Sequence, residues 1–453
     1  MLTALLFIIF NCISYLLALV RGPFWGLFAY MNVYFNAPND AFNWWAAYIP
    51  FDRWSLLSTA ILIISLLIHR SKLSKHKFEN AKWVYWFFII SIPIALTSKL
   101  NPQETNNYLF YLLTYCIVVF VFIKTIANFD QLRLFLLSTV VLTSTLSIGA
   151  YLHGERINSR LEFVGTGDAF GSNQFSLLLA AIIPIVVPFI TNGKKYEKII
   201  CILSLPFIVN AFILCNSRGA TVALIIAVIF SVLVVADNKM RKNMIFIIAL
   251  SLPGFFYLTD SEFIGRFSTL FKIDSAIENE QQANKLSSGR TEIWLYGLQM
   301  LRDHPFGVGP NGFKELARYY MPDEILTTKK NTAYGRRAAH NTYLQVLVEQ
   351  GVIGIIIWVI MIGTTCVVLF RSLRIYKFLK VKNRFWSNMT FAQNISFYSI
   401  IAGGMVTSRV YYEYFWWQIA ISAILFSLTK NLNDENKNQE IGVGSVNNEY
   451  IRK

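Results

Sequence analysis

The chain has 453 residues, of which 55% are hydrophobic and 15% are charged, and its formal net charge is +15. A soluble domain needs more polar residues to cover its surface, so this composition excludes an ordinary soluble enzyme. The basic residues are spread over many short loops, which argues against a nucleic-acid-binding face and fits membrane topology and anionic headgroups. All five cysteines lie inside apolar runs, so we expect neither a disulfide framework nor a metal site from them.

Apolar runs long enough to cross a bilayer recur along most of the chain and predict an all-α polytopic membrane protein. The first run lacks a basic leading segment and a small-residue cleavage site, which favours a retained helix over a signal peptide. Hydropathy predicts about 12 transmembrane helices. They lie near residues 2–20, 54–69, 83–97, 108–128, 132–152, 172–191, 197–215, 219–236, 243–258, 342–370, 390–408 and 413–429.

Lysine and arginine alternate between the loops that join these predicted spans. The loops at 70–82, 194–198, 239–242 and 371–384 are rich in them, whereas the loops in between hold only one or two. Because basic loops stay on the cytoplasmic side, this alternation predicts that both termini are cytoplasmic.

The chain therefore divides into four predicted segments. Residues 1–258 hold transmembrane helices 1–9, and residues 259–341 form an extracytoplasmic cap, which is too long for a simple connector. Residues 342–429 hold transmembrane helices 10–12, and residues 430–453 form a polar cytoplasmic tail that is predicted to be disordered.

The cap contains two predicted amphipathic helices, "GRTEIWLYGLQMLRDHP" and "NGFKELARYYMP", joined by a glycine-proline turn. Asn311 precedes the second helix as a capping residue. Their apolar faces are formed by Trp294, Leu295, Leu298 and Leu301, and by Phe313, Leu316, Ala317 and Tyr320. We expect such helices to lie over the membrane face and to roof a cavity.

No nucleotide-binding loop or metal-binding motif occurs in a plausible context, so the candidate chemistry rests on isolated polar residues at the outer ends of spans. Arg218, in "CNSRGATVAL", lies between two apolar runs. A charge at membrane depth costs about 2.5–3.5 kcal/mol even on the lenient insertion scale. Snorkelling of the Arg218 side chain to the headgroups is one explanation. A fixed cation that faces a lipid-linked anion is favoured, because the flanking helices are otherwise apolar.

Two further segments carry candidate anion-binding residues. Arg160 precedes a glycine-rich turn and then Asn173 and Gln174, which begin a span. Backbone N–H groups and a helix dipole there suit an anion, although an ordinary loop and helix cap fit equally well. Arg290 lies in the first turn of a cap helix, where the dipole disfavours a cation. An anionic partner would explain this placement, and a plain surface charge is the alternative.

The fourth segment is "RRAAHNTYLQVLVEQGVIG". If it is helical, Asn341, Gln345 and Glu349 share one face, which must look into the bundle or a wet cavity. His340 lies at the outer end of this face and is either a cap or bystander, or a general base. Arg336 and Arg337, just before it, are most simply explained as headgroup anchors, with donor contacts as the alternative.

In this order, "GSNQFSLLLA", "NSRGATVAL", "GRTEIWLYGLQMLRDHPFGVGPNGF" and "AHNTYLQVLVEQGVIG" resemble the bacterial O-antigen ligase and polymerase superfamily, as does the long external loop before the tenth span. The resemblance covers roughly residues 150–370. The stretch "AYMNVYFNAPNDAFNWWAAYIPFDR" is also similar to the branch of exosortase-associated O-glycosylation ligases.

This resemblance implies a metal-independent glycosyltransferase of the GT-C type with no cofactor. It would move a glycan from undecaprenyl diphosphate to an acceptor hydroxyl, on the lipid A core of lipopolysaccharide or on a protein serine or threonine. The reaction would take place on the outer face of the bacterial cytoplasmic (inner) membrane. The implied catalytic residues are His340, Arg218 and Arg290. The implied substrate-binding residues are Arg160, Asn173, Gln174, Asn341, Tyr343, Gln345 and Glu349.

In this reading the arginines hold the donor diphosphate, and His340 deprotonates the acceptor or only positions it. Two other functions stay open. A polymerase of polysaccharide repeat units uses the same donor chemistry on the same fold. A transporter or flippase for lipid or polysaccharide would need ionisable residues through the bilayer midplane and broken helices in both halves. An inert scaffold would leave Arg218 unexplained.

Overall fold

The computed structural model describes residues 2–38, 46, 48–49, 51–98, 100–157, 160–234, 242, 290–323, 325–326, 335–379 and 383–450. Over these residues the chain forms fourteen α-helices and one short β-hairpin, so the all-α prediction is confirmed. The predicted span at 243–258 and the first 31 residues of the predicted cap, 259–289, lie outside the described residues.

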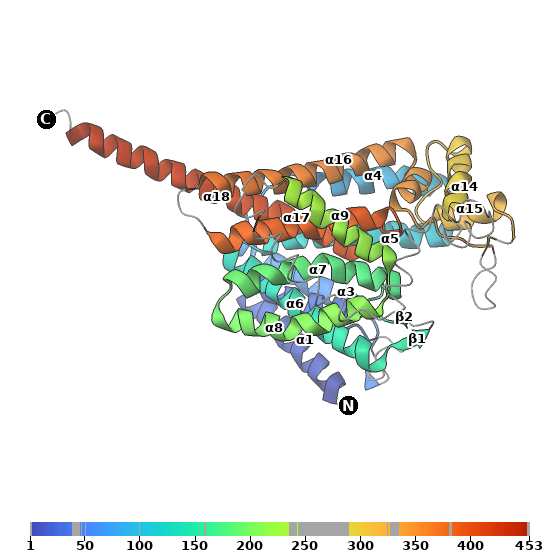
Figure 1. The fold of residues 1–453 in the computed structure, drawn as a ribbon, viewed down its shortest axis with the longest axis horizontal. Helices are drawn as coiled ribbons and strands as arrows, with labels where there is room; N and C mark the ends of the chain where they lie inside the picture. Colours follow the sequence, from blue (N-terminus) through green and yellow to red (C-terminus); the bar gives the residue numbers. More distant parts are fainter. Residues whose placement is uncertain are drawn as a thin grey trace.

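Twelve of the helices pack into a bundle, most of which extends along the long axis of the molecule (Figure 1). They are α1 (Leu2–Arg21), α2 (Gly26–Phe35), α3 (Trp54–Ile68), α4 (Lys82–Thr97), α5 (Pro102–Thr125), α6 (Phe129–His153), α7 (Ser172–Asn192), α8 (Lys195–Leu214), α9 (Arg218–Val234), α16 (Thr342–Phe378), α17 (Arg384–Gly404) and α18 (Glu413–Tyr450). At one end of this bundle lie α14 (Arg290–Asp303) and α15 (Gly312–Tyr320), and α14 crosses the bundle direction (Figure 1). The hairpin strands are β1 (Glu155–Ile157) and β2 (Arg160–Glu162), which pair antiparallel.

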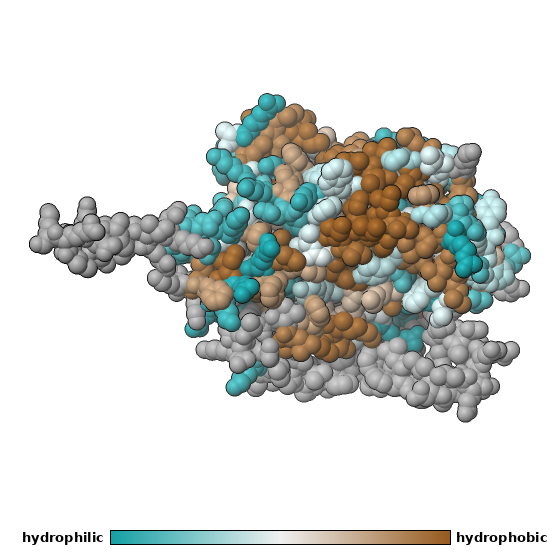
Figure 2. Space-filling model, turned by 90° about the horizontal axis from the view of Figure 1, so that it is seen from above, coloured by the Kyte–Doolittle hydropathy of each residue, from teal (hydrophilic) through white to brown (hydrophobic). Residues whose placement is uncertain are grey.

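Six of the bundle helices, α1, α5, α6, α7, α8 and α16, are long and apolar enough to cross a membrane by length and composition. Shorter apolar helices are α3, α4 and most of α9. Figure 2 shows hydrophobic residues gathered in the middle of one face and hydrophilic residues toward its two ends. The chain is therefore a polytopic helical membrane protein, and the count of 12 spans stays a prediction.

Two helices differ from the hydropathy prediction. The sequence pattern places no helix at α2, which has only ten residues, too few to cross a bilayer. It packs back against α1 after a break at Gly22 and Pro23. The second difference is α18, which continues to Tyr450 beyond the point where composition predicts a disordered tail. Extending an existing helix avoids the nucleation cost that a separate polar helix would face.

The helix α16 is not regular, although its sequence predicts a continuous span. Gly351 has φ 66° and ψ −170°, so the backbone leaves the helical conformation there. The turn between α14 and α15 docks at this kink. The N–H groups of Val308 and Gly309 donate to the carbonyls of Val348 and Glu349, at 3.2 and 3.0 Å. In return the N–H of Val352 donates to the carbonyl of Pro305 at 3.0 Å.

These three hydrogen bonds replace bonds that a straight helix would make within itself, so the kink and the cap depend on each other. Two glycines permit the close backbone contact. A Cβ at Gly351 would overlap the carbonyl group of Phe306, and a Cβ at Gly307 would lie 2.7 Å from the carbonyl oxygen of Glu349. The glycines of "HPFGVGPNGF" and "EQGVIG" thus hold the cap on the bundle.

The packed face of α14 differs from the predicted apolar face. The helix buries Ile293, Gly297 and Met300, whereas Leu295 and Leu298 are 59% and 53% exposed. Gly297 explains the difference, because a Cβ there would lie 2.7 Å from the side chain of Leu344 on α16. The close approach of two helices, rather than the number of leucines, selects the face. By contrast, α15 buries Phe313, Leu316 and Ala317, three of the four residues that its pattern indicates.

Candidate functional site

Four arginines from distant parts of the chain come together at the cap end of the bundle. Arg160 lies on β2, Arg218 begins α9, Arg290 begins α14, and Arg337 lies on the loop before α16. We call these four residues the cation cluster. Burial lowers the pKa of the Arg290 guanidinium, and the neighbouring positive charges lower it further. In order of effect, those charges are Arg218, Arg160 and Arg337. The site therefore concentrates like charges, which is unfavourable unless an anion binds among them.

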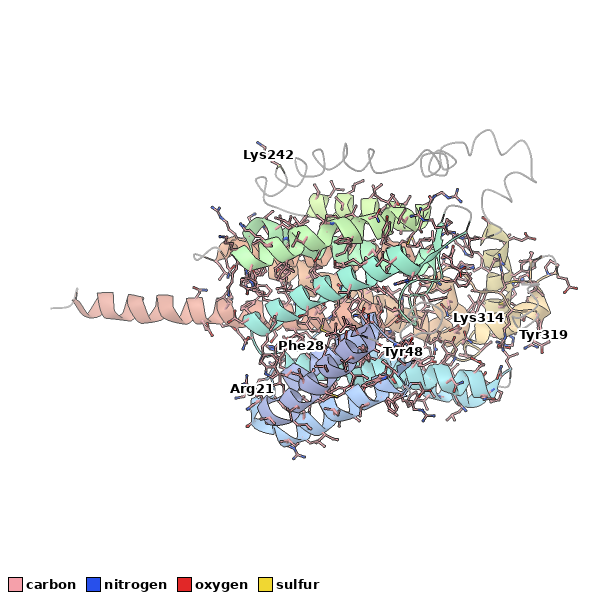
Figure 3. The ribbon with its side chains drawn as sticks, turned by 90° about the horizontal axis from the view of Figure 1, so that it is seen from below. Arg21, Phe28, Tyr48, Lys242, Lys314 and Tyr319 are labelled. Carbon is pink, nitrogen blue, oxygen red and sulfur yellow. The ribbon has the colours of Figure 1, made fainter. Side chains whose placement is uncertain are left out.

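His340 lies beside this cluster. Burial lowers the pKa of its imidazole to about 4, and the charges of Arg290, Arg337 and Lys314 act in the same direction. Lys314 lies on α15, at the end of the molecule away from Arg21 (Figure 3). The imidazole is thus neutral at neutral pH, with one ring nitrogen free to accept a proton.

The backbone around His340 is held by the cap and by the start of α16. His340 itself has φ 48°, in the left-handed region. The indole N–H of Trp294 on α14 donates to the carbonyl of Ala339 at 3.2 Å. On the other side, the Asn341 side chain accepts the first free N–H groups of α16, from Tyr343 and Leu344, at 3.0 and 3.1 Å. The position of His340 is therefore coupled to the docking of α14.

The predicted polar face of α16 looks into the protein interior, as its pattern indicates. Glu349 is 0% exposed, and its carboxylate accepts hydrogen bonds from Gln345 at 3.0 Å and from the Tyr411 hydroxyl at 2.7 Å. The Tyr411 hydroxyl in turn accepts the backbone N–H of Asn311 at 2.9 Å. Asn311 has a left-handed backbone and makes no side-chain cap. These residues join α16 to the cap and to the loop before α18.

Tyr343 has a partner of its own, because its hydroxyl donates to the carbonyl of Ile401 on α17 at 2.9 Å. With Asn341 engaged at the helix start, the residues that follow His340 have clear packing and capping contacts. The structure therefore gives these candidates packing and capping contacts, and their role in substrate binding stays a proposal.

Asn173 joins Arg160 to Ser217, the residue directly before Arg218. Its side-chain oxygen accepts hydrogen bonds from Arg160 at 2.8 Å and from the Ser217 hydroxyl at 3.0 Å. Arg160 also donates to the carbonyl of Cys215 at 3.3 Å, so β2 and the start of α9 share one network. The glycine-rich turn before Asn173 has a structural contact, since the Asp168 carboxylate accepts the N–H of Glu413 at the start of α18 at 2.6 Å.

Arg409, which is not among the residues predicted for the site, lies in the short loop between α17 and α18. It is buried, and its guanidinium donates to the carbonyl of Gln174 at 3.1 Å and lies 4.3 Å from the ring centroid of Tyr412. One of its nitrogens, Nη1, has no hydrogen-bond partner within the described part of the chain. The signal for it was the same as for Arg218, a lone arginine between two apolar helices.

Arg336 is an ion-pair partner, a role that its simplest sequence-based explanation, a headgroup anchor, did not predict. Its guanidinium lies 2.6 Å from Glu315 on α15, and Arg318 contacts the other oxygen of the same carboxylate at 2.7 Å. Glu315 is 2% exposed, so the two arginines compensate a buried charge and fasten the loop before His340 to the cap.

The fold and these contacts define a polytopic membrane protein with a cluster of arginines and a neutral histidine beneath a helical cap at one end of its bundle. Residues 201–359 match the family described as O-antigen ligase, which confirms the resemblance to the O-antigen ligase superfamily. The matched region contains Arg218, Arg290, Arg337 and His340, whereas Arg160 precedes it. No curated protein matches the chain.

Proposed function

We propose that this protein is a glycosyltransferase that transfers a glycan from undecaprenyl diphosphate to an acceptor hydroxyl on the outer face of the cytoplasmic membrane. The observation that carries the proposal is the convergence of Arg160 and Arg218 on Arg290, whose charge in turn acts on His340. The family match supports O-antigen ligase-like activity in general. The donor, the acceptor class and the GT-C architecture rest on the resemblance and on the chemistry of these residues.

In the proposed reaction the acceptor oxygen attacks the anomeric carbon of the glycan, and the bond from that carbon to the phosphate oxygen breaks. The bonding electrons stay on the diphosphate, which leaves with additional negative charge. Guanidinium groups offer permanent charge and paired N–H donors to such an oxyanion, and they need no metal ion to do so. His340, neutral in the free protein, accepts the proton that the acceptor hydroxyl loses.

The orientation in the membrane is part of the proposal. The cap end carries the cation cluster, and the opposite end carries the basic loop at 70–82, so the positive-inside rule directs the cap outward. The C-terminal end of the chain is then cytoplasmic, and the segments 259–341 and 1–258 are the external cap and the predicted first nine spans. A cytoplasmic N-terminus does not fit this orientation, because Lys72 of the basic loop donates to the carbonyl of Arg21 at 2.8 Å. The C-terminal end of α1 therefore lies at the cytoplasmic end of the bundle, and the start of α1 lies toward the cap side. The partners are the lipid-linked glycan, the hydroxyl acceptor and membrane lipids, with no cofactor and no metal ion.

The test is glycan transfer by isolated membranes that carry single-residue variants at matched expression. We expect Arg218→Ala and His340→Ala each to reduce transfer at least about 100-fold, in the range for loss of one oxyanion-stabilising donor or a general base. Arg21→Ala is the control, because it removes a positive charge from an exposed position at the other end of the molecule (Figure 3). If both site variants kept near-normal transfer, the mechanism would be wrong.

Ligation and polymerisation share this donor chemistry and differ in the acceptor. A deletion strain separates them: accumulation of lipid-linked glycan with unmodified acceptor indicates a ligase, and loss of long chains alone indicates a polymerase. A transporter would move labelled donor across vesicles without forming a glycosidic product.

A further inference from the structure

Two adjacent arginines before α16 have different environments. Arg336 pairs with the buried Glu315 at 2.6 Å. Arg337 contacts no carboxylate within the described part of the chain, and its Nε is buried with no hydrogen-bond partner there. A buried charged donor that lacks an acceptor is unfavourable, because it has lost water without gaining a replacement.

The neighbours of Arg337 add to this cost. Its charge acts on Arg290 and on His340, so it lies within electrostatic reach of both. Arg290 likewise has no ion pair among the residues that the structure describes. Arg160, by contrast, lies 3.7 Å from Glu162 and bonds to Asn173. Of these three arginines the least compensated are Arg290 and Arg337, whose charges both act on His340.

We propose that Arg337 is a further donor-binding residue, which binds the diphosphate together with Arg290 and so places the leaving group beside His340. This inference rests on the proposed function. A guanidinium with a free Nε–H and a second guanidinium nearby suits a group with several phosphate oxygens, because each can form paired hydrogen bonds to it. A diphosphate carries enough negative charge to offset both.

The arrangement links donor binding to the state of His340. The charged groups that face the imidazole are Arg290 from α14, Lys314 from α15 and Arg337 from its own loop. A bound diphosphate opposes all three charges, so it raises the pKa of His340 from about 4 toward its ordinary value. His340 becomes a stronger base when the donor is in place and stays a weak one when the site is empty.

The first test measures binding of undecaprenyl diphosphate to the purified full-length protein in phosphatidylcholine nanodiscs, with undecaprenol and phosphatidylglycerol as comparison lipids. We expect Arg337→Gln and Arg290→Gln each to weaken undecaprenyl diphosphate binding about tenfold or more, with little change for undecaprenol. Arg337→Lys should recover part of the affinity, since it keeps the charge and loses the paired geometry.

Two controls separate this effect from net charge and from folding. Arg302→Gln removes one positive charge from an exposed position on α14 and should leave affinity within about twofold, as expected for a screened surface charge. Arg336→Gln breaks the contact to Glu315 and should lower thermal stability more than affinity. Melting temperatures of all variants show whether each protein is folded in the binding assay.

The outcomes are distinct. If Arg290→Gln loses affinity and Arg337→Gln does not, the inference about Arg337 is overturned and the proposed function stands. If Arg337→Gln weakens phosphatidylglycerol binding as much as undecaprenyl diphosphate binding, Arg337 is a headgroup anchor and the inference is again wrong. If neither variant affects undecaprenyl diphosphate binding, the proposed donor site itself fails.

The second test measures how kcat and kcat/KM for glycan transfer fall as the pH is lowered. In the wild type, kcat should have a higher apparent pKa on this acid limb than kcat/KM, because kcat reports the donor complex and kcat/KM the free enzyme. Arg337→Gln should narrow this difference, because it removes one of the charges that disfavour protonation of His340. The apparent pKa on the acid limb of kcat/KM should therefore rise. An unchanged difference would contradict the coupling of Arg337 to His340.

Discussion

Gly351→Ala should release the cap from the bundle. Gly351 has φ 66° and ψ −170°, a combination that is essentially restricted to glycine. An alanine held in this conformation costs about 1–3 kcal/mol. Its Cβ would also overlap the carbonyl of Phe306, so the turn between α14 and α15 must move.

The displacement of that turn affects three backbone hydrogen bonds, which link Val308 to Val348, Gly309 to Glu349 and Pro305 to Val352. Each is worth on the order of 1 kcal/mol net. Part of this loss is recovered if α16 straightens and forms its own bonds. We therefore expect docking of the cap to weaken by about 3–4 kcal/mol, which corresponds to a factor of roughly 100 to 1,000 in the population of the undocked state.

Hydrogen–deuterium exchange of the purified protein measures this directly. The amides of Val308 and Gly309 should exchange about 100 to 1,000 times faster in Gly351→Ala, provided that they exchange by undocking in the wild type. Amides in the middle of α7 should not change. Transfer activity should fall as well, because Trp294 of the cap holds the loop that carries His340.

Gly363→Ala is the matched control, since it lies on the same helix, has nothing within 4 Å of its added Cβ and has a helical backbone. It should be neutral or stabilising by up to about 1 kcal/mol. If Gly351→Ala left amide exchange, melting temperature and transfer unchanged, the explanation of the kink would be refuted.

Further predictions concern the surroundings of the site. The pKa of His340 is lowered to about 4, so its basic form is lost only as pH falls through that value; kcat/KM should be flat from neutral pH down to about pH 5 and fall below it. Glu315→Gln should lower stability by roughly 1–3 kcal/mol, because it leaves Arg336 and a second arginine without their carboxylate, and thermal unfolding would show it. Asn341→Ala should cost about 1 kcal/mol through loss of the α16 cap; an unchanged melting temperature would contradict that capping contact.

Hydropathy was sufficient to predict an all-α membrane bundle, because each apolar run carries its own evidence of length and composition. The kink at Gly351 could not be predicted from the sequence. The residues around it read as one continuous helix, and the groups that replace the helical hydrogen bonds come from residues 305–309, far away in the chain. Periodicity within one segment contains no information about such a distant partner.

The prediction of the packed face of α14 was wrong for a related reason. Leu295 and Leu298 outweigh Gly297 in any hydrophobic pattern, yet the glycine is where α14 approaches Leu344 of α16. A sequence pattern shows which residues prefer burial. The fit between the two helix surfaces decides which of those residues are buried.

For the site, the resemblance named Arg160, Arg218, Arg290 and His340 together, and the structure brings them to one end of the bundle. Spacing alone could not have done so, since they lie on separate elements. Arg336 and Arg337 could not be told apart in the sequence, because only the position of Glu315 on α15 decides which of them has a carboxylate partner.

The most direct test of the central claim supplies purified protein in liposomes with a defined glycan on undecaprenyl diphosphate and a hydroxyl acceptor. Mass spectrometry then follows donor, acceptor and both products. The proposed reaction predicts one glycosylated acceptor for each undecaprenyl diphosphate released, and loss of both products in His340→Ala. Donor that crosses the bilayer intact, with no glycosidic product, would contradict the claim that this protein is a glycosyltransferase.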